Sequence, residues 1–296
     1  IFLSSYTSVA FGLNFLDSGN TAALNGAQHN DGKAVITVTA SDGGDAKAVV
    51  EIEVTEPVVD AEITLADPAV DGIARGTEYQ FNGMKFVVGY TAFPTLKQAV
   101  EVATSTVYVA AGAYEENITI DKTGFQIIGP NSGINPVQAT RLPEAEIKGK
   151  ITIGANLKNI VIKGLAFTGN GCVDTNNSVN GIEISYNNIY DTNAEPAAWV
   201  EGRTQVETVF DFWNDNGVEA TDIVVKYNKF SGVTETNILF ARNTNVTVTN
   251  NAFLNFGRDA IRCEGGYNYG VWTFDKNVFK NDEVSANNGI YFQSVS

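Results

Sequence analysis

The chain has 296 residues, 44% of them hydrophobic and 18% charged, which is enough apolar sequence for about two globular domains. Asp and Glu outnumber Lys and Arg by 34 to 19, so the net charge is −15. This balance argues against a nucleic-acid partner and against charge-based attachment to anionic lipid. No apolar run approaches the roughly 18 residues of a membrane span. The chain contains only one histidine and two cysteines, too few for a zinc cluster or a disulfide framework.

The first section, residues 1–57, has the pattern of antiparallel β-structure. Apolar and polar residues alternate over 34–39 and 48–54, on either side of an Asp-Gly-Gly-Asp turn, and this pattern predicts a hairpin. The strings AVITVTASDG and EIEVT resemble the last two strands of bacterial immunoglobulin-like modules. The resemblance implies a small immunoglobulin-like β-sandwich module. Because the section is short for a complete sandwich, we expect a partial module, of the kind that serves as a spacer on surface proteins or virions.

A transition is predicted over residues 58–89, and the clearest helix of the chain follows at 95–103. Its apolar residues recur at positions i, i+3, i+4 and i+7, and Thr95 is suited to cap the N-terminus. These apolar residues are Leu96, Ala99, Val100 and Ala103. They predict an amphipathic helix with one buried face.

The segment that starts at this helix carries a second resemblance. TLKQAVEVATSTVYVAAGAYEENITIDKTGFQIIGPNSG resembles the opening of right-handed parallel β-helix proteins of the pectin-lyase-like superfamily. In that superfamily a helix caps the N-terminal end of the solenoid, and the first coil carries the string V-x-P-G-x-Y-x-E-x-I-x-I. Ala111 stands where the superfamily often has proline. The resemblance implies an all-β fold with a parallel β-helix over residues 90–296, but no particular function, since lyases, esterases, adhesins and viral fibres share this fold.

Internal repeats predict the same fold without the resemblance. Short strands recur between residues 160 and 279, each followed by Asn or Gly and then by a large apolar residue. The apolar markers are 22, 41, 23 and 26 residues apart, and we interpret the interval of 41 as two coils, with an irregular one near 206–213. Of the 31 asparagines, 23 lie from Asn156 onward. They predict left-handed coil corners and stacked hydrogen-bond ladders.

A second strand per coil is predicted at 199–203, 238–242, 261–265 and 290–294, all in one phase. Because side chains alternate faces along a strand, Cys263 should point inward as a core residue. Cys172 should then lie about four coils away, and both thiols should be free. Two outward columns are expected: Leu239, Arg262 and Tyr291, and Ala241, Glu264 and Gln293. The last strand lies close to the end of the sequence, so we expect a neighbouring protein subunit or a continuing chain to cover that end.

The resemblance implies that a polysaccharide or cell-surface glycan binds on the outer face of the β-helix. Arginine forks suit carboxylates, and aromatic faces suit sugar rings. The candidate glycan-binding residues are Trp199, Arg203, Arg242, Arg262, Glu264, Tyr267 and Tyr269. The alternative is that these are ordinary surface residues.

Four acidic residues in one loop region form a weaker candidate site for Ca²⁺, which prefers hard oxygen ligands. They are Asp211, Asp215, Glu219 and Asp222. Their spacing matches no EF-hand loop, and solvated loop carboxylates are the alternative. The sequence indicates no other cofactor.

Two functions remain open. The first is a non-catalytic extracellular, cell-surface or virion protein, such as an adhesin, a fibre or a decoration, with a rigid face that binds glycans. The second is a polysaccharide-degrading enzyme, most plausibly a pectate-lyase-like lyase that uses Ca²⁺ and an Arg or Lys base. The sequence strings typical of pectin methylesterases are absent. Polygalacturonase-type hydrolases need a histidine in the site, and the one histidine, His29, lies outside the predicted β-helix. A glycosidase needs only a carboxylate pair at a set separation.

Overall fold

The computed structural model describes residues 29–30, 33–39, 47–53, 60–175, 178–192, 208–214, 220–233, 235–264, 269–282 and 288–292. The chain divides into two compact units, Ile1–Val58 and Val59–Ser296. In the first unit, β1 (His29–Asn30), β2 (Lys33–Thr39) and β3 (Lys47–Glu53) form an antiparallel sheet. Lys33 lies opposite Glu53 and Thr39 opposite Lys47. This pairing confirms the predicted hairpin.

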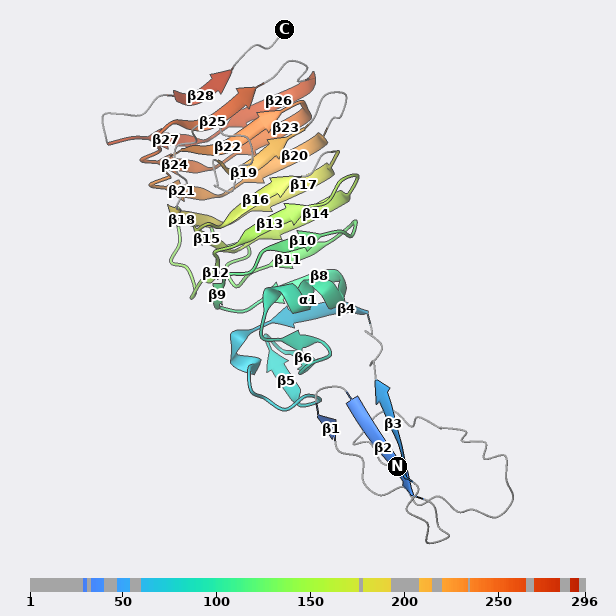
Figure 1. The fold of residues 1–296 in the computed structure, drawn as a ribbon. Helices are drawn as coiled ribbons and strands as arrows, with labels where there is room; N and C mark the ends of the chain where they lie inside the picture. Colours follow the sequence, from blue (N-terminus) through green and yellow to red (C-terminus); the bar gives the residue numbers. More distant parts are fainter. Residues whose placement is uncertain are drawn as a thin grey trace. The chain divides into compact units, whose positions relative to one another are not determined.

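The described strands of the second unit form three parallel sheets and one small hairpin (Figure 1). Sheet 1 contains β4 (Ala61–Ala66), β7 (Ala92–Phe93), β8 (Ala103–Val109), β11 (Gln126–Ile128), β14 (Lys158–Lys163), β17 (Asn180–Ser185), β20 (Ala220–Lys226), β23 (Asn243–Thr249) and β26 (Tyr269–Asp275). Sheet 2 contains β9 (Gly112–Tyr114), β12 (Ala145–Ile147), β15 (Ala166–Gly169), β18 (Asn188–Thr192), β21 (Lys229–Ser231), β24 (Ala252–Leu254) and β27 (Val278–Lys280). Sheet 3 contains β10 (Ile118–Ile120), β13 (Lys150–Ile153), β16 (Cys172–Thr175), β19 (Thr208–Trp213), β22 (Thr236–Ala241), β25 (Asp259–Glu264) and β28 (Asn288–Phe292).

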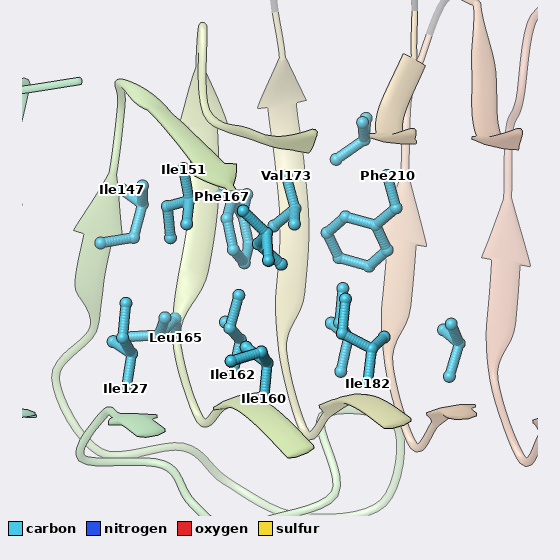
Figure 2. Packing of buried hydrophobic residues seen from close by; sticks show 14 of the residues in the cluster. Ile127, Ile147, Ile151, Ile160, Ile162, Leu165, Phe167, Val173, Ile182 and Phe210 are labelled. Carbon is cyan, nitrogen blue, oxygen red and sulfur yellow. The ribbon is translucent and has the colours of Figure 1, made fainter. Parts of the chain in front are cut away.

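From β8 onward the chain visits sheets 1, 2 and 3 in turn, and the described strands complete seven such coils. The unit is therefore a right-handed parallel β-helix, as predicted. Its interior is built from columns of apolar side chains, one from each coil, because strand residues alternate between the two faces. Figure 2 shows Ile127, Ile162 and Ile182 from sheet 1 facing the same interior as Phe167 and Phe210. In sheet 2, inward aromatic rings stack from coil to coil, with centroids 4.8–5.1 Å apart from Phe230 through Phe253 to Phe279.

Helix α1 (Leu96–Val102) packs against β4, β8 and β10 near the start of the solenoid. Thr95 Oγ1 accepts a hydrogen bond from the backbone N of Gln98 at 3.3 Å, which is the predicted N-cap. Leu96, Ala99 and Val100 are buried in the main core, so the predicted buried face is confirmed. A second, smaller core lies on the far side of β4, beneath η1 (Pro68–Val70) and the antiparallel hairpin of β5 (Glu78–Phe81) and β6 (Met84–Val87).

Two expectations about the coils need correction. Strand β4 pairs with β8, so residues 58–89, expected as a transition, contain a strand of sheet 1. Ile184 lies directly opposite Val225, so the interval of 41 residues is one coil and the two-coil interpretation is wrong. The additional length lies between β18 and β19, in residues 193–207, which are outside the described part of the chain. Accordingly β19, a regular strand with Phe210 opposite Ile238, takes the place expected for 199–203.

Asparagines fix the corner between sheets 1 and 2. Asn187, Asn228 and Asn251 each donate from Nδ2 to Oδ1 of the next coil's asparagine, ending at Asn277, and all three distances are 3.0 Å. The residue before each of them has a positive φ of 55–58°. The predicted left-handed corners and the predicted ladder are therefore confirmed. Each side-chain amide also donates to a backbone carbonyl, as Asn228 does to the oxygen of Ile184 at 2.9 Å. The ladder therefore supplies hydrogen-bond partners for buried polar groups in successive coils.

Candidate functional site

The outer face of sheet 3 changes along the solenoid, from paired threonines and paired aspartates to a different residue in each of the last three described coils. One outward column runs through successive strands in the order Thr119, Thr152, Asp174, Asp211, Leu239, Arg262 and Tyr291. The column expected for Leu239, Arg262 and Tyr291 is thus present, and Ala241 lies opposite Glu264 as expected. Inward, Phe240 and Cys263 are fully buried, whereas Phe292 of the last described strand is 53% exposed.

Arg262 is engaged by acidic neighbours from its own strand. Its guanidinium donates to Glu264 and, at 2.9 Å, to Asp259, and it lies 4.6 Å from the ring centroid of Tyr291. Burial by itself lowers the pKa of Arg262. The hydrogen bonds to Asp259 and Glu264, together with the charges of these two carboxylates, raise the pKa by a larger amount, so the net shift is upward. The residue stays a cation, and the two carboxylates already balance its charge.

Arg242 has a different environment, although it also lies in a coil next to that of Arg262. It follows β22 at a corner with φ of 57°, and Nη1 donates to the backbone oxygen of Asn214 at 2.6 Å. Its Nε is buried without a hydrogen-bond partner, and no described carboxylate forms an ion pair with it. Because Arg262 lies opposite Leu239, the two arginines are not cross-strand neighbours. They therefore do not form a pair of guanidinium groups on adjacent strands.

Trp213, which the sequence analysis did not single out, lies beside Arg242. It ends β19 opposite Ala241, and 38% of its surface is exposed. The guanidinium carbon of Arg242 lies 5.6 Å from the centroid of the Trp213 ring, within the range of a cation–π contact. The exposed indole and the arginine, which no described carboxylate pairs with, together form an aromatic and cationic surface, which we call the Trp213–Arg242 surface.

Two carboxylates occupy neighbouring positions in the outward column. Asp174 lies directly opposite Asp211 on adjacent strands, and Lys150 donates to Asp174 at 2.8 Å. Asp211 also accepts a hydrogen bond from the backbone N of Trp213 at 2.9 Å. The hydrogen bond to Asp174 raises the pKa of Lys150, against a smaller effect of burial, so Lys150 is a cation at neutral pH.

The described part of the proposed calcium set is split between two sheets. Asp211 lies in β19 of sheet 3 and Asp222 in β20 of sheet 1, where Asp222 accepts from Asn245 at 3.1 Å. Among the described residues, no three His, Cys, Asp or Glu side chains are placed to hold a metal ion. Asp215 and Glu219, like Trp199, Arg203 and Tyr267, lie outside the described residues, and of Tyr269 only the backbone is described.

The cysteines are buried and free, as predicted. Burial raises the pKa of each thiol to about 12. Their strands, β16 and β25, are three steps apart in sheet 3 rather than the expected four coils, because the interval of 41 residues is a single coil. At about 4.8 Å per step, the separation is roughly 14 Å, still too far for a disulfide.

No protein family, curated protein or solved structure matches this chain. The fold and the outer-face geometry are therefore the basis for a functional proposal. In the part of the chain that is described, no helix has the length and apolar character needed to cross a membrane.

Proposed function

We propose that the chain is a non-catalytic surface protein that binds an acidic glycan on the outer face of its β-helix. The proposal includes membership of the pectin-lyase-like superfamily, a partial immunoglobulin-like module before the helix, and a place outside the cell, on a cell surface or on a virion. Stacked parallel strands support this role because they hold surface side chains at fixed intervals of about 4.8 Å, a spacing suited to an extended polymer.

The Trp213–Arg242 surface is the observation that carries the proposal. A sugar ring can stack on the exposed indole while its carboxylate accepts hydrogen bonds from the guanidinium. Arg242 suits this role because it is partly exposed and has no carboxylate partner among the described residues. With a net charge of −15, the chain as a whole repels polyanions, so binding has to be local.

Affinity electrophoresis in gels that contain polygalacturonate, alginate or hyaluronate tests the proposal. We expect the acidic polymer to retard the wild type, and Trp213→Ala and Arg242→Ala to lose most of that retardation. Lys85→Ala, which removes an exposed positive charge from the β5–β6 hairpin, is the matched control and should behave as the wild type. Equal retardation of the Arg242→Ala variant and the wild type, or none of either in all three polymers, would contradict the proposal.

A second candidate function, a polysaccharide-degrading enzyme, is favoured by the Asp174–Asp211 pair. Opposite residues on adjacent strands are about 4.8 Å apart, close to the roughly 5–5.5 Å between the carboxyl groups of retaining glycosidases. A lyase is less well supported, because a lyase base must accept a proton and both Lys150 and Arg262 have raised pKa values. Release of reducing ends reports hydrolysis, and ultraviolet absorbance of unsaturated uronates reports a lyase. Activity that Asp174→Asn and Asp211→Asn abolish would establish the enzyme, and no activity would favour the non-catalytic proposal.

A further inference from the structure

Two tyrosines form a stack at the corner between sheets 1 and 2, on a different part of the molecule from the Trp213–Arg242 surface. Tyr186 follows β17 and Tyr227 follows β20, which are adjacent strands of sheet 1 (Figure 1). Their ring centroids are 5.0 Å apart and the rings are within 8° of parallel. Both side chains are half-buried, and neither hydroxyl has a hydrogen-bond partner among the residues that the structure describes.

The backbone under these rings is unusual for tyrosine. Tyr186 and Tyr227 have φ values of 58° and 55°, in a region that bulky residues rarely adopt. Equivalent corners of other coils carry Gly164, Asn250 and Lys276, and glycine and asparagine are the residues best suited to this conformation. Tyrosine at two successive corners costs backbone strain that the fold does not require, and such outliers often mark functional positions.

The surrounding structure fixes the stack in place. Each tyrosine immediately precedes a buried asparagine of the ladder, Asn187 or Asn228. On the N-terminal side, Arg141 from the long connection between β11 and β12 donates to the backbone oxygen of Tyr186 at 2.9 Å. The same guanidinium donates to Glu144 at 2.6 Å. The rings are therefore held before any ligand arrives, which lowers the entropic cost of binding.

The stack ends at the coil after Tyr227. The equivalent position there is Asn250, which has no ring to continue the stack, and the next is Lys276. Two lysines next to the corner are paired with carboxylates, Lys226 with Glu183 at 2.8 Å and Lys276 with Asp275 at 3.4 Å. The corner itself offers a terminal aromatic ring, an amide and hydroxyl groups, which are uncharged.

We propose that this corner is a second carbohydrate-binding site, which takes an uncharged hexopyranose ring in the step beyond Tyr227. The sugar continues the stack over Asn250, with its apolar face against the Tyr227 ring and its hydroxyls near the amide and phenol groups. Because the ring, amide and phenol groups of the corner are uncharged, a neutral sugar is favoured over a uronate. The site is independent of the proposed acidic-glycan function, because it uses other residues, another corner and another class of glycan.

Affinity electrophoresis with dextran, galactomannan and xyloglucan tests this site. We expect the wild type to be retarded by at least one of these neutral polymers, and Tyr227→Ala to bind it about tenfold more weakly, a loss consistent with one aromatic contact. Tyr227→Phe, which keeps the ring, should retain most of the binding. Tyr90→Ala removes an exposed ring elsewhere, 37% exposed in the wild type, and should have no effect.

A second variant separates loss of the site from loss of the fold. Asn250→Tyr adds a third ring at a corner that already accommodates tyrosine in two coils, so the fold should persist while the ring fills the sugar's place and blocks binding. Unimpaired binding by Asn250→Tyr or Tyr227→Ala would overturn the proposal, and so would the absence of wild-type retardation in all three neutral polymers. Trp213→Ala should leave neutral-polymer binding unchanged, so the two proposed sites can fail separately.

Discussion

The interior of the β-helix and the outer face of sheet 3 are made from the same strands but follow opposite rules. Inside, each coil repeats its neighbour: Phe230, Phe253 and Phe279 stack in one column, and the Asn187–Asn277 ladder repeats one hydrogen bond. Outside, the sheet 3 column changes from Asp211 to Leu239 and Arg262 in three successive coils. Repetition therefore marks the residues that hold the fold, and its absence marks the residues available for binding.

The largest effect is expected where the repeated interior meets helix α1. Leu96 is 1% exposed, so Leu96→Asp places a charge in an apolar contact and should cost about 4 kcal/mol or more, or yield insoluble protein. Lys97→Ala, on the exposed side of the same helix, is the control. Thermal unfolding measures the difference, and an unchanged melting temperature for Leu96→Asp would show that α1 does not close the core.

Removing one step of the ladder should have the next largest effect. Asn228→Ala removes the acceptor of the backbone N of Asn187, one of the two acceptors of its Nδ2, and the side-chain donor to the oxygen of Ile184, a loss of about 3 kcal/mol. The control is Asn156→Gly, an exposed asparagine at a positive φ that glycine accepts. Denaturant unfolding should separate the two variants, and equal stability would mean that the ladder contributes little.

Buried thiols should be protected by the same interior. Because burial raises the pKa of Cys172 and Cys263 from 9.0 to about 12, they contribute stability below pH 9 that is lost as the pH rises toward 12. We expect slow alkylation of the native protein at pH 8 and two rapidly modified thiols after denaturation. Rapid native alkylation would place at least one thiol outside the core.

The smallest effect on stability is expected on the outer face. Trp213→Ala and Arg242→Ala remove side chains that lie outside the repeated interior. Arg242→Ala also loses the hydrogen bond to Asn214, so each variant should lose about 1 kcal/mol, clearly less than Asn228→Ala. Urea unfolding of both variants beside the wild type checks this. A loss comparable to that of Asn228→Ala would mean that this surface also holds the fold.

The contrast also explains what the sequence revealed. The interior could be predicted because its period appears directly in the spacing of apolar residues and asparagines, and α1 because its apolar positions and Thr95 cap are local. The outer face could not, because its register depends on which strand follows which. Counting the interval from Ile184 to Val225 as two coils assigned the sheet 3 strand of this coil to 199–203. It thereby hid Trp213 of β19, whose neighbour is Ala241. Arg262 forms ion pairs with carboxylates, whereas Arg242 forms none with the described residues. This difference depends on tertiary contacts, so no local sequence pattern predicts it.

Comparing binding and stability in the same variants tests the central claim most directly. Dissociation constants for polygalacturonate, measured by calorimetry at two salt concentrations, can be set beside the melting temperatures of the wild type, Trp213→Ala and Arg242→Ala. We predict binding that weakens as salt rises, a loss of about tenfold or more in each variant, and melting temperatures within about 4 °C of the wild type. Wild-type affinity in both variants, or binding lost only together with the fold, would contradict the assignment of function to the Trp213–Arg242 surface.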